Sequence, residues 1–171
     1  ETSGTINNDG IICAGASATL TATGGTAYLW STGETTASIT VNPAGNTTYA
    51  VTVTNANNCS ATATRAITVN ALPTAGISPA NTNICTGGFA LLTASGGASY
   101  LWNTNATTAA INVNPAVTTS YQVTVTNASG CTSTASATVN VNAVPALTFT
   151  KVEPTACVAT NGSIDLSVGG T

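Results

Sequence analysis

The stretch Thr48–Cys59, with the sequence TYAVTVTNANNC, occurs a second time as SYQVTVTNASGC at Ser120–Cys131. In the first copy Tyr49, Val51 and Val53 alternate with threonine and alanine. This two-residue period is typical of a half-buried β-strand. Asparagine follows the strand in both copies, so a turn is expected just before each cysteine. We therefore expect the fold to be organised around this strand and its copy.

The chain contains an internal repeat of 72 residues. Shifting the sequence by that length aligns residues 12–70 with 84–142 without a gap, and more than half of the positions are identical. Matched residues include Cys13 and Cys85, Trp30 and Trp102, Tyr49 and Tyr121, and Cys59 and Cys131. The same shift carries Cys85 to Cys157. The sequence therefore predicts repeat 1 at 1–72, repeat 2 at 73–144 and the truncated start of a third repeat at 145–171.

Each repeat reads as a series of short strands separated by turns, without a helical period. In repeat 1 alternating patterns cover 18–23, 28–30, 37–41, 48–54 and 61–69. This spacing favours an all-β fold of tandem immunoglobulin-like β-sandwich modules. Trp30 and Trp102 on the third strand, and Tyr49 and Tyr121 on the repeated strand, are expected in the core. Arg65 falls on an inward position, so either its strand bulges there or the side chain lies at an open end of the sandwich.

The third segment repeats the second-strand pattern. Ile164, Leu166 and Val168 take the inward positions, and Ser163, Asp165 and Ser167 take the outward ones. So short a segment is not enough to close a sandwich. We expect other residues to complete it.

Only 4% of the residues are charged, and Lys151 and Arg65 are the sole basic side chains. Nucleic-acid binding and polybasic membrane attachment both need basic residues, so neither is expected. No apolar run is long enough for a spanning helix, so membrane insertion is not expected either. The chain contains no Met, which predicts a piece of a longer, processed polypeptide.

The sequence offers no chemistry of the usual catalytic kinds. Histidine is absent, so triads and the commonest general base are missing. The five acidic residues do not recur between the repeats, which argues against a carboxylate pair or a calcium loop. We expect no catalytic residue, no metal site and no cofactor. The chain is not predicted to be an enzyme.

The cysteines lie far apart, at Cys13, Cys59, Cys85, Cys131 and Cys157, and none forms a CxxC pair. In a small β module such spacing favours disulfides over zinc, and hence an oxidising, extracellular compartment. Pairing within a repeat, Cys13 with Cys59 and Cys85 with Cys131, is slightly favoured. The alternative joins two repeats through Cys13 and Cys131. Cys157 would then need a partner outside the chain.

Several of these motifs resemble immunoglobulin-like repeats of large secreted Bacteroidota surface adhesins. They are Cys13–Gly15, the Gly24–Gly25 turn, 28–33, and 49–55 through Cys59. Residues 157–170, with Asn161–Leu166 and Gly169–Gly170, are similar to the start of the SprB-type repeat, named for a gliding-motility adhesin. The resemblance implies type IX secretion, a location at the cell surface or outside the cell, and a role in a stalk or adhesive array. It supplies no catalytic residues.

Three functions remain open from the sequence. The favoured one is a structural spacer or stalk in a long extracellular adhesin or filament. Its partners would be neighbouring repeats of the same long chain, and the low charge would also allow lateral self-association. The second is a carbohydrate- or surface-binding module with a polysaccharide ligand, suggested by rows of outward-facing threonines. The third is an accessory region of a secreted multidomain hydrolase.

Overall fold

A computed structural model of the chain describes residues 4–7, 10–152 and 163–169. The chain divides into two compact units. Unit 1 contains Glu1–Thr74 together with Gly96–Ala98 and Val125–Ser133, and unit 2 contains the remaining residues. Two turns of repeat 2, around Gly97 and around Asn127, therefore belong to the same unit as repeat 1.

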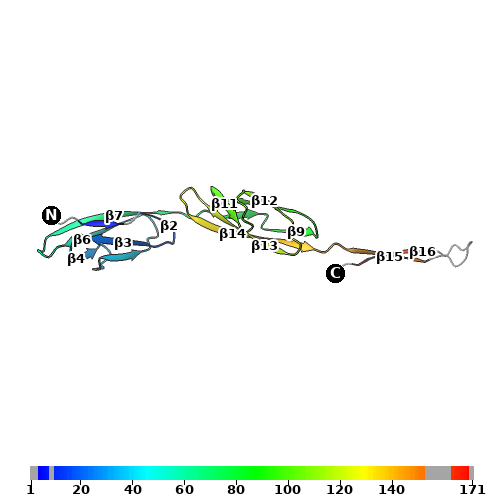
Figure 1. The fold of residues 1–171 in the computed structure, drawn as a ribbon, viewed down its shortest axis with the longest axis horizontal. Coiled ribbons are helices and arrows are strands. Elements are labelled where there is room, and N and C mark those ends of the chain that lie inside the picture. Colours follow the sequence, from blue (N-terminus) through cyan, green and yellow to red (C-terminus); the bar gives the residue numbers. More distant parts are fainter. Residues whose placement is uncertain (1–3, 8–9, 153–162, 170–171) are drawn as a thin grey trace, which may run out of the picture. The chain divides into compact units, whose positions relative to one another are not determined.

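Repeat 1 folds into two packed sheets (Figure 1). A three-stranded sheet has the order β1-β3-β5, and a four-stranded sheet has the order β2-β7-β6-β4. Neighbouring strands run antiparallel, except that β2 runs parallel to β7. The strands are β1 (Thr5–Asn7), β2 (Ile11–Cys13), β3 (Ala18–Thr23), β4 (Ala27–Trp30), β5 (Ser38–Val41), β6 (Thr47–Thr54) and β7 (Ser60–Asn70).

The alternation seen in the sequence becomes the alternation between core and surface. Leu20 on β3 and Val51 and Val53 on β6 are fully buried, while their threonine neighbours are exposed or only partly covered. Burying a Val or Leu side chain contributes about 1.5–3 kcal/mol. The strands therefore hold together through one apolar face each, as a sandwich requires.

Repeat 2 forms the same arrangement a second time. Its sheets have the orders β12-β10-β8 and β11-β13-β14-β9, and β9 runs parallel to β14 as β2 does to β7. The strands are β8 (Gly76–Ser78), β9 (Asn81–Cys85), β10 (Ala90–Ser95), β11 (Ser99–Trp102), β12 (Ala110–Val113), β13 (Thr119–Thr126) and β14 (Thr132–Asn142). Five of these strands begin and end 72 residues after their counterparts. The sequence repeat is therefore a structural repeat.

Seven strands in two packed sheets, without a helix among the described residues, make each repeat an immunoglobulin-like β-sandwich. The predicted fold class is confirmed. The structure buries Trp30, Trp102, Tyr49 and Tyr121, each at most 8% exposed. The indole N–H groups of the two tryptophans donate hydrogen bonds to Thr36 O at 2.8 Å and Thr108 O at 2.9 Å. These bonds satisfy the polar atom that a buried tryptophan carries.

The β7 strand passes Arg65 without a bulge. Its pairing with β6 is continuous from Thr54 opposite Ser60 to Thr47 opposite Ile67, and Arg65 lies opposite Tyr49. A Cβ atom placed on Gly10 would come within 3.2 Å of the Arg65 guanidinium. The glycine therefore leaves room for the guanidinium, and the bulge considered from the sequence is wrong.

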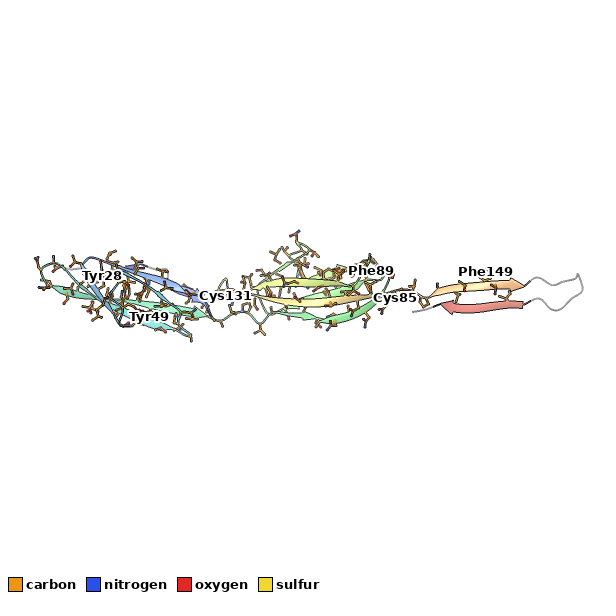
Figure 2. All side chains as sticks on the ribbon, turned by 90° about the horizontal axis from the view of Figure 1, so that it is seen from below. Tyr28, Tyr49, Cys85, Phe89, Cys131 and Phe149 are labelled. Atoms are coloured by element: carbon orange, nitrogen blue, oxygen red, sulfur yellow. A yellow bond between two sulfur atoms is a disulfide. The ribbon has the colours of Figure 1, made fainter. Side chains whose placement is uncertain are left out.

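The third segment contributes two described strands, β15 (Ala146–Val152) and β16 (Ser163–Gly169), which pair antiparallel. Leu147 lies opposite Val168, and Phe149 (Figure 2) lies opposite Leu166. Leu147, Phe149 and Ile164 are each more than 60% exposed. Ile164 is exposed because these two strands alone do not close a sandwich, as expected from the length of the segment. The side chains of Leu166 and Val168 lie outside the part of the chain that the structure describes.

Candidate functional site: the disulfide and its two turns

A disulfide joins Cys13 to Cys131, with 5.7 Å between the Cα atoms and a sequence separation of 118 residues. Cys13 is the last residue of β2, and Cys131 (Figure 2) lies in the turn between β13 and β14. The bond therefore links repeat 1 to the turn of repeat 2 that belongs to unit 1. An oxidised pair of this kind fits an extracellular location.

The pairing preferred from the sequence, Cys13 with Cys59 and Cys85 with Cys131, is wrong. Cys13 lies opposite Asn70, the last residue of β7, whereas Cys59 directly precedes the first residue of that strand. The 11 residues of β7 extend over roughly 35 Å at about 3.4 Å per residue. Disulfides require Cα atoms about 4.4–6.8 Å apart, so the length of β7 excludes a bond within repeat 1.

A tight turn fixes the position of Cys13. The Cys13 carbonyl oxygen accepts a hydrogen bond from Ala16 N at 3.0 Å, and Ala14 N donates to Asn70 O at 2.8 Å. Gly15 has a φ of +82°, a left-handed conformation that glycine adopts without strain. We call Cys13–Gly15 and its copy Cys85–Gly87 the cysteine–glycine turns. Each fixes a cysteine at the end of a strand that runs parallel to the last strand of its repeat.

The side chain of Asn127 shapes the turn that carries Cys131. Its Oδ1 accepts hydrogen bonds from Ser129 N and Cys131 N, both at 3.0 Å, and its Nδ2 donates to Ala71 O at 2.9 Å. The same amide therefore closes the turn around Cys131 and contacts the segment that links the repeats. We call Asn127–Cys131 and its copy Asn55–Cys59 the asparagine turns. Asparagine favours such turns because its side chain replaces a backbone acceptor.

The joined cysteine Cys131 is buried next to the end of β7. Cys131 is 1% exposed, and its Sγ lies 3.9 Å from the carbonyl oxygen of Asn70. Pro73, in the segment between the repeats, is also buried. In the chain-entropy description a disulfide that closes 118 residues stabilises the folded state by about 5 kcal/mol. For a protein of marginal stability this is a large contribution.

Two further cysteines of the described residues are not in disulfides. Cys59 and Cys85 are free and exposed, and Cys157 lies outside the described residues. The structure thus brings together two of the five predicted cysteines. Sequence reasoning predicted these turns but missed that the side chain of the first asparagine accepts hydrogen bonds from the backbone of each turn. Its signal was the spacing Asn-x-x-x-Cys, which both repeats share at Asn55 and Asn127.

The described residues contain no group of three or more His, Cys, Asp or Glu side chains that could hold a metal ion. Over the same residues, no helix has the length and apolar character needed to cross a membrane. The carboxyl group of Glu34 has a shifted pKa. A hydrogen bond with the Thr32 side chain, followed by one with the backbone of Glu34 itself, lowers the pKa of Glu34 from its ordinary value.

No protein-family model and no curated protein matches the chain. Among solved structures, three N-terminal domains of the highly immunogenic outer capsid protein (Hoc) of bacteriophage RB49 are similar at 17% identity and a TM-score of 0.43. That match covers 99% of this chain and 71% of that one. Murine CEACAM1b is similar at 13% identity and a TM-score of 0.37, covering 81% and 100%.

The four N-terminal Ig domains of Dscam1 isoform 8.4 are similar at 15% identity and a TM-score of 0.36. The match covers 81% of this chain and 46% of that one, so the chain spans less than half of that structure. The fold assignment therefore rests on the strand order and burial of this chain. Its repeats are immunoglobulin-like modules joined by a disulfide.

Proposed function

We propose that these modules are non-catalytic structural spacers in a long extracellular adhesin or filament at the cell surface. The observation that carries the proposal is the disulfide between Cys13 of repeat 1 and Cys131 of repeat 2. A bond within one module would stabilise that module alone. A bond between successive modules stabilises the array as a whole, because it restrains the segment that links one module to the next.

The local structure around the disulfide supports the same role. The linker is short, its Pro73 is buried, and its Ala71 carbonyl accepts a hydrogen bond from Asn127. Each module also contains a long strand of 11 residues, β7 or β14, which spans roughly 35 Å. Repetition of such units would lengthen the protein by a similar amount per module and would hold a distal region away from a surface.

The resemblance to Bacteroidota repeats supports the finer part of the proposal. On that basis the parent protein is exported by type IX secretion and acts in surface adhesion of the kind used in gliding motility. Its partners are neighbouring repeats of the same long chain, with lateral self-association favoured by the low charge.

Pulling the oxidised chain by its ends in a force spectrometer tests the spacer role. Force passing through the disulfide bypasses the backbone between Cys13 and Cys131. At about 3.5 Å per residue, the 118 residues of that interval account for roughly 410 Å of extension. We expect the unfolded contour length of the oxidised protein to be shorter by this amount than that of the Cys13→Ala/Cys131→Ala variant.

Two outcomes would contradict the spacer role. One is an equal extension of the oxidised protein and the double variant, since the disulfide would then carry no load. The other is specific retention of the chain on polysaccharide columns or hydrolysis of a polysaccharide. The Cys59→Ala/Cys85→Ala variant is the matched control, and its extension should equal that of the unsubstituted protein.

A further inference from the structure

Cys59 and Cys85 are the counterparts of the two joined cysteines. A shift of 72 residues converts Cys13 into Cys85 and Cys59 into Cys131. Cys85 thus belongs to a cysteine–glycine turn and Cys59 to an asparagine turn. The chain thus contains a second cysteine–glycine turn and a second asparagine turn. These two turns lie in different repeats and do not meet.

Cys85 (Figure 2) lies in a turn with the same backbone hydrogen bonds as the turn at Cys13. Thr86 N donates to Asn142 O at 2.9 Å, and Gly88 N donates to Cys85 O at 2.8 Å. Gly87 has a φ of +83°. In the register of β9 and β14, Cys85 lies opposite Asn142, as Cys13 lies opposite Asn70. Cys85 is therefore held in the geometry that accepts a partner at Cys13.

The turn at Cys59 matches the occupied turn at Cys131. Asn55 Oδ1 accepts hydrogen bonds from Asn57 N at 2.9 Å and from Cys59 N at 3.0 Å. Asn55 N donates to Cys59 O at 2.9 Å, as Asn127 N does to Cys131 O at 3.0 Å. The turn at Cys59 therefore has the same backbone conformation as the turn at Cys131, although Cys59 forms no disulfide. A partner cysteine would meet a thiol in a preformed turn.

The residues around the Cys13–Cys131 disulfide are more buried than their counterparts around the free cysteines. Cys131 and Pro73 are buried, whereas Cys59 and Pro145 in the equivalent positions are exposed. Asn70 is partly buried, and its counterpart Asn142 is exposed. Equivalent residues are therefore buried where the turn of a second module packs against them, and exposed where no such turn is present.

We propose that Cys85 forms a disulfide with the cysteine of an asparagine turn in a module on its C-terminal side, 118 residues further along the polypeptide. Cys59 correspondingly bonds to the cysteine–glycine turn of a module on its N-terminal side. This proposal rests on the proposed function, because it needs flanking modules of the same array. Each module is then joined to both neighbours, and Ala143 O takes the role of Ala71 O as acceptor for the incoming asparagine.

The bond forms by thiol–disulfide exchange with a small-molecule disulfide such as oxidised glutathione. The Cys85 thiolate attacks one glutathione sulfur and releases one glutathione thiolate. The incoming cysteine thiolate then attacks the mixed disulfide and releases the second. Two protein thiols and one oxidised glutathione become one protein disulfide and two reduced glutathiones. The short linker raises the effective concentration of the incoming turn at Cys85.

The test uses the full chain with one additional copy of residues 73–144 inserted between Val144 and Pro145. This insertion places an asparagine-turn cysteine 118 residues after Cys85. The protein is refolded in a glutathione buffer, alkylated without reduction, digested and analysed by mass spectrometry. In the inserted copy, Cys85→Ser and Ser129→Ala give its peptides masses that differ from those of the original repeat. We expect a linked peptide that joins Cys85 to the inserted asparagine turn, and a fall in Cys85 alkylation from near-complete to undetectable. The matched control replaces the inserted asparagine-turn cysteine by serine and should restore full alkylation of Cys85.

The peptide that links Cys13 to Cys131 reports folding in every sample. Formation of that peptide while Cys85 stays alkylated, or a bond from Cys85 to Cys59, would overturn the proposal. Loss of the Cys13–Cys131 peptide in the lengthened chain would also overturn the proposal, because the insertion does not change the sequence between these two cysteines. The extension of the original chain under force does not depend on these results, so the spacer role can stand if Cys85 remains a thiol.

Discussion

Asn127 Nδ2 donates a hydrogen bond to the carbonyl oxygen of Ala71, 56 residues earlier in the chain, at 2.9 Å. This one amide couples the turn that carries Cys131 to the linker between the repeats. The disulfide and the hydrogen bond therefore act on the same few residues of unit 1.

Replacing Asn127 by aspartate separates these two tasks. Aspartate keeps an oxygen that can accept from Ser129 N and Cys131 N, but it loses the donor to Ala71 O. We expect the turn to persist and the free energy of unfolding to fall by about 1–2 kcal/mol. Denaturant unfolding of the oxidised protein measures the loss. An unchanged free energy of unfolding for Asn127→Asp would contradict a role for the Ala71 contact.

Removing the disulfide should cost more than any single hydrogen bond. For a closed interval of 118 residues, the Cys13→Ala/Cys131→Ala variant is expected to lose about 5 kcal/mol. The transition midpoint in denaturant should move accordingly. Cys59→Ala/Cys85→Ala removes two exposed thiols and should leave stability nearly unchanged. Equal midpoints for the two double variants would show that the bond does not restrain the unfolded chain.

Gly25 should not tolerate a side chain. A Cβ atom there would collide with Val53 Cγ1 and lie 2.6 Å from Thr54 O, so backbone or core must move. We expect Gly25→Ala to lower the free energy of unfolding by about 1–3 kcal/mol. Gly45 has open space around its Cβ position, which makes Gly45→Ala the matched control. A thermal scan that ranks the two variants equally would contradict the close approach of the Gly24–Gly25 turn to β6.

The carboxyl group of Glu34 should titrate below its ordinary pKa, because the Thr32 side chain hydrogen-bonds its charged form. Its contribution to stability is present above the ordinary pKa and is lost as pH falls through the lowered value. NMR titration of the side-chain carboxyl checks the direction. Thr32→Val removes the donor and should raise the pKa of Glu34 toward its ordinary value. Thr104→Val changes the equivalent residue of repeat 2 and should have no effect on Glu34.

Much of the fold could be predicted because β-strands bury every second residue. The pattern of Tyr49, Val51 and Val53 identified β6, and the 72-residue shift then identified β13. The short strands β1 and β2 carry too few residues for a period to show. The parallel pairing of β2 with β7 depends on the tertiary fold, so no local pattern predicts it.

The site was predicted less well than the core. Spacing identified the cysteines, but pairing depends on which end of the sandwich each one occupies, and β7 sets that distance. The bulge at Arg65 was wrong because a charged residue in an inward phase can be accommodated by a neighbouring glycine, here Gly10. The asparagine turns were read as turns from composition. The hydrogen bond from Asn127 to the linker could not be read from sequence, because the acceptor Ala71 lies far away in the chain.

The bond between Cys13 and Cys131 also changes how the chain responds to proteases. A single cut at any peptide bond between these cysteines leaves both fragments covalently attached to each other. The exposed turns of that interval, including Asn55–Cys59 and Cys85–Gly87, can therefore be nicked without releasing whatever lies beyond them. A surface fibre built in this way would lose its end only after reduction or after a cut outside a closed interval.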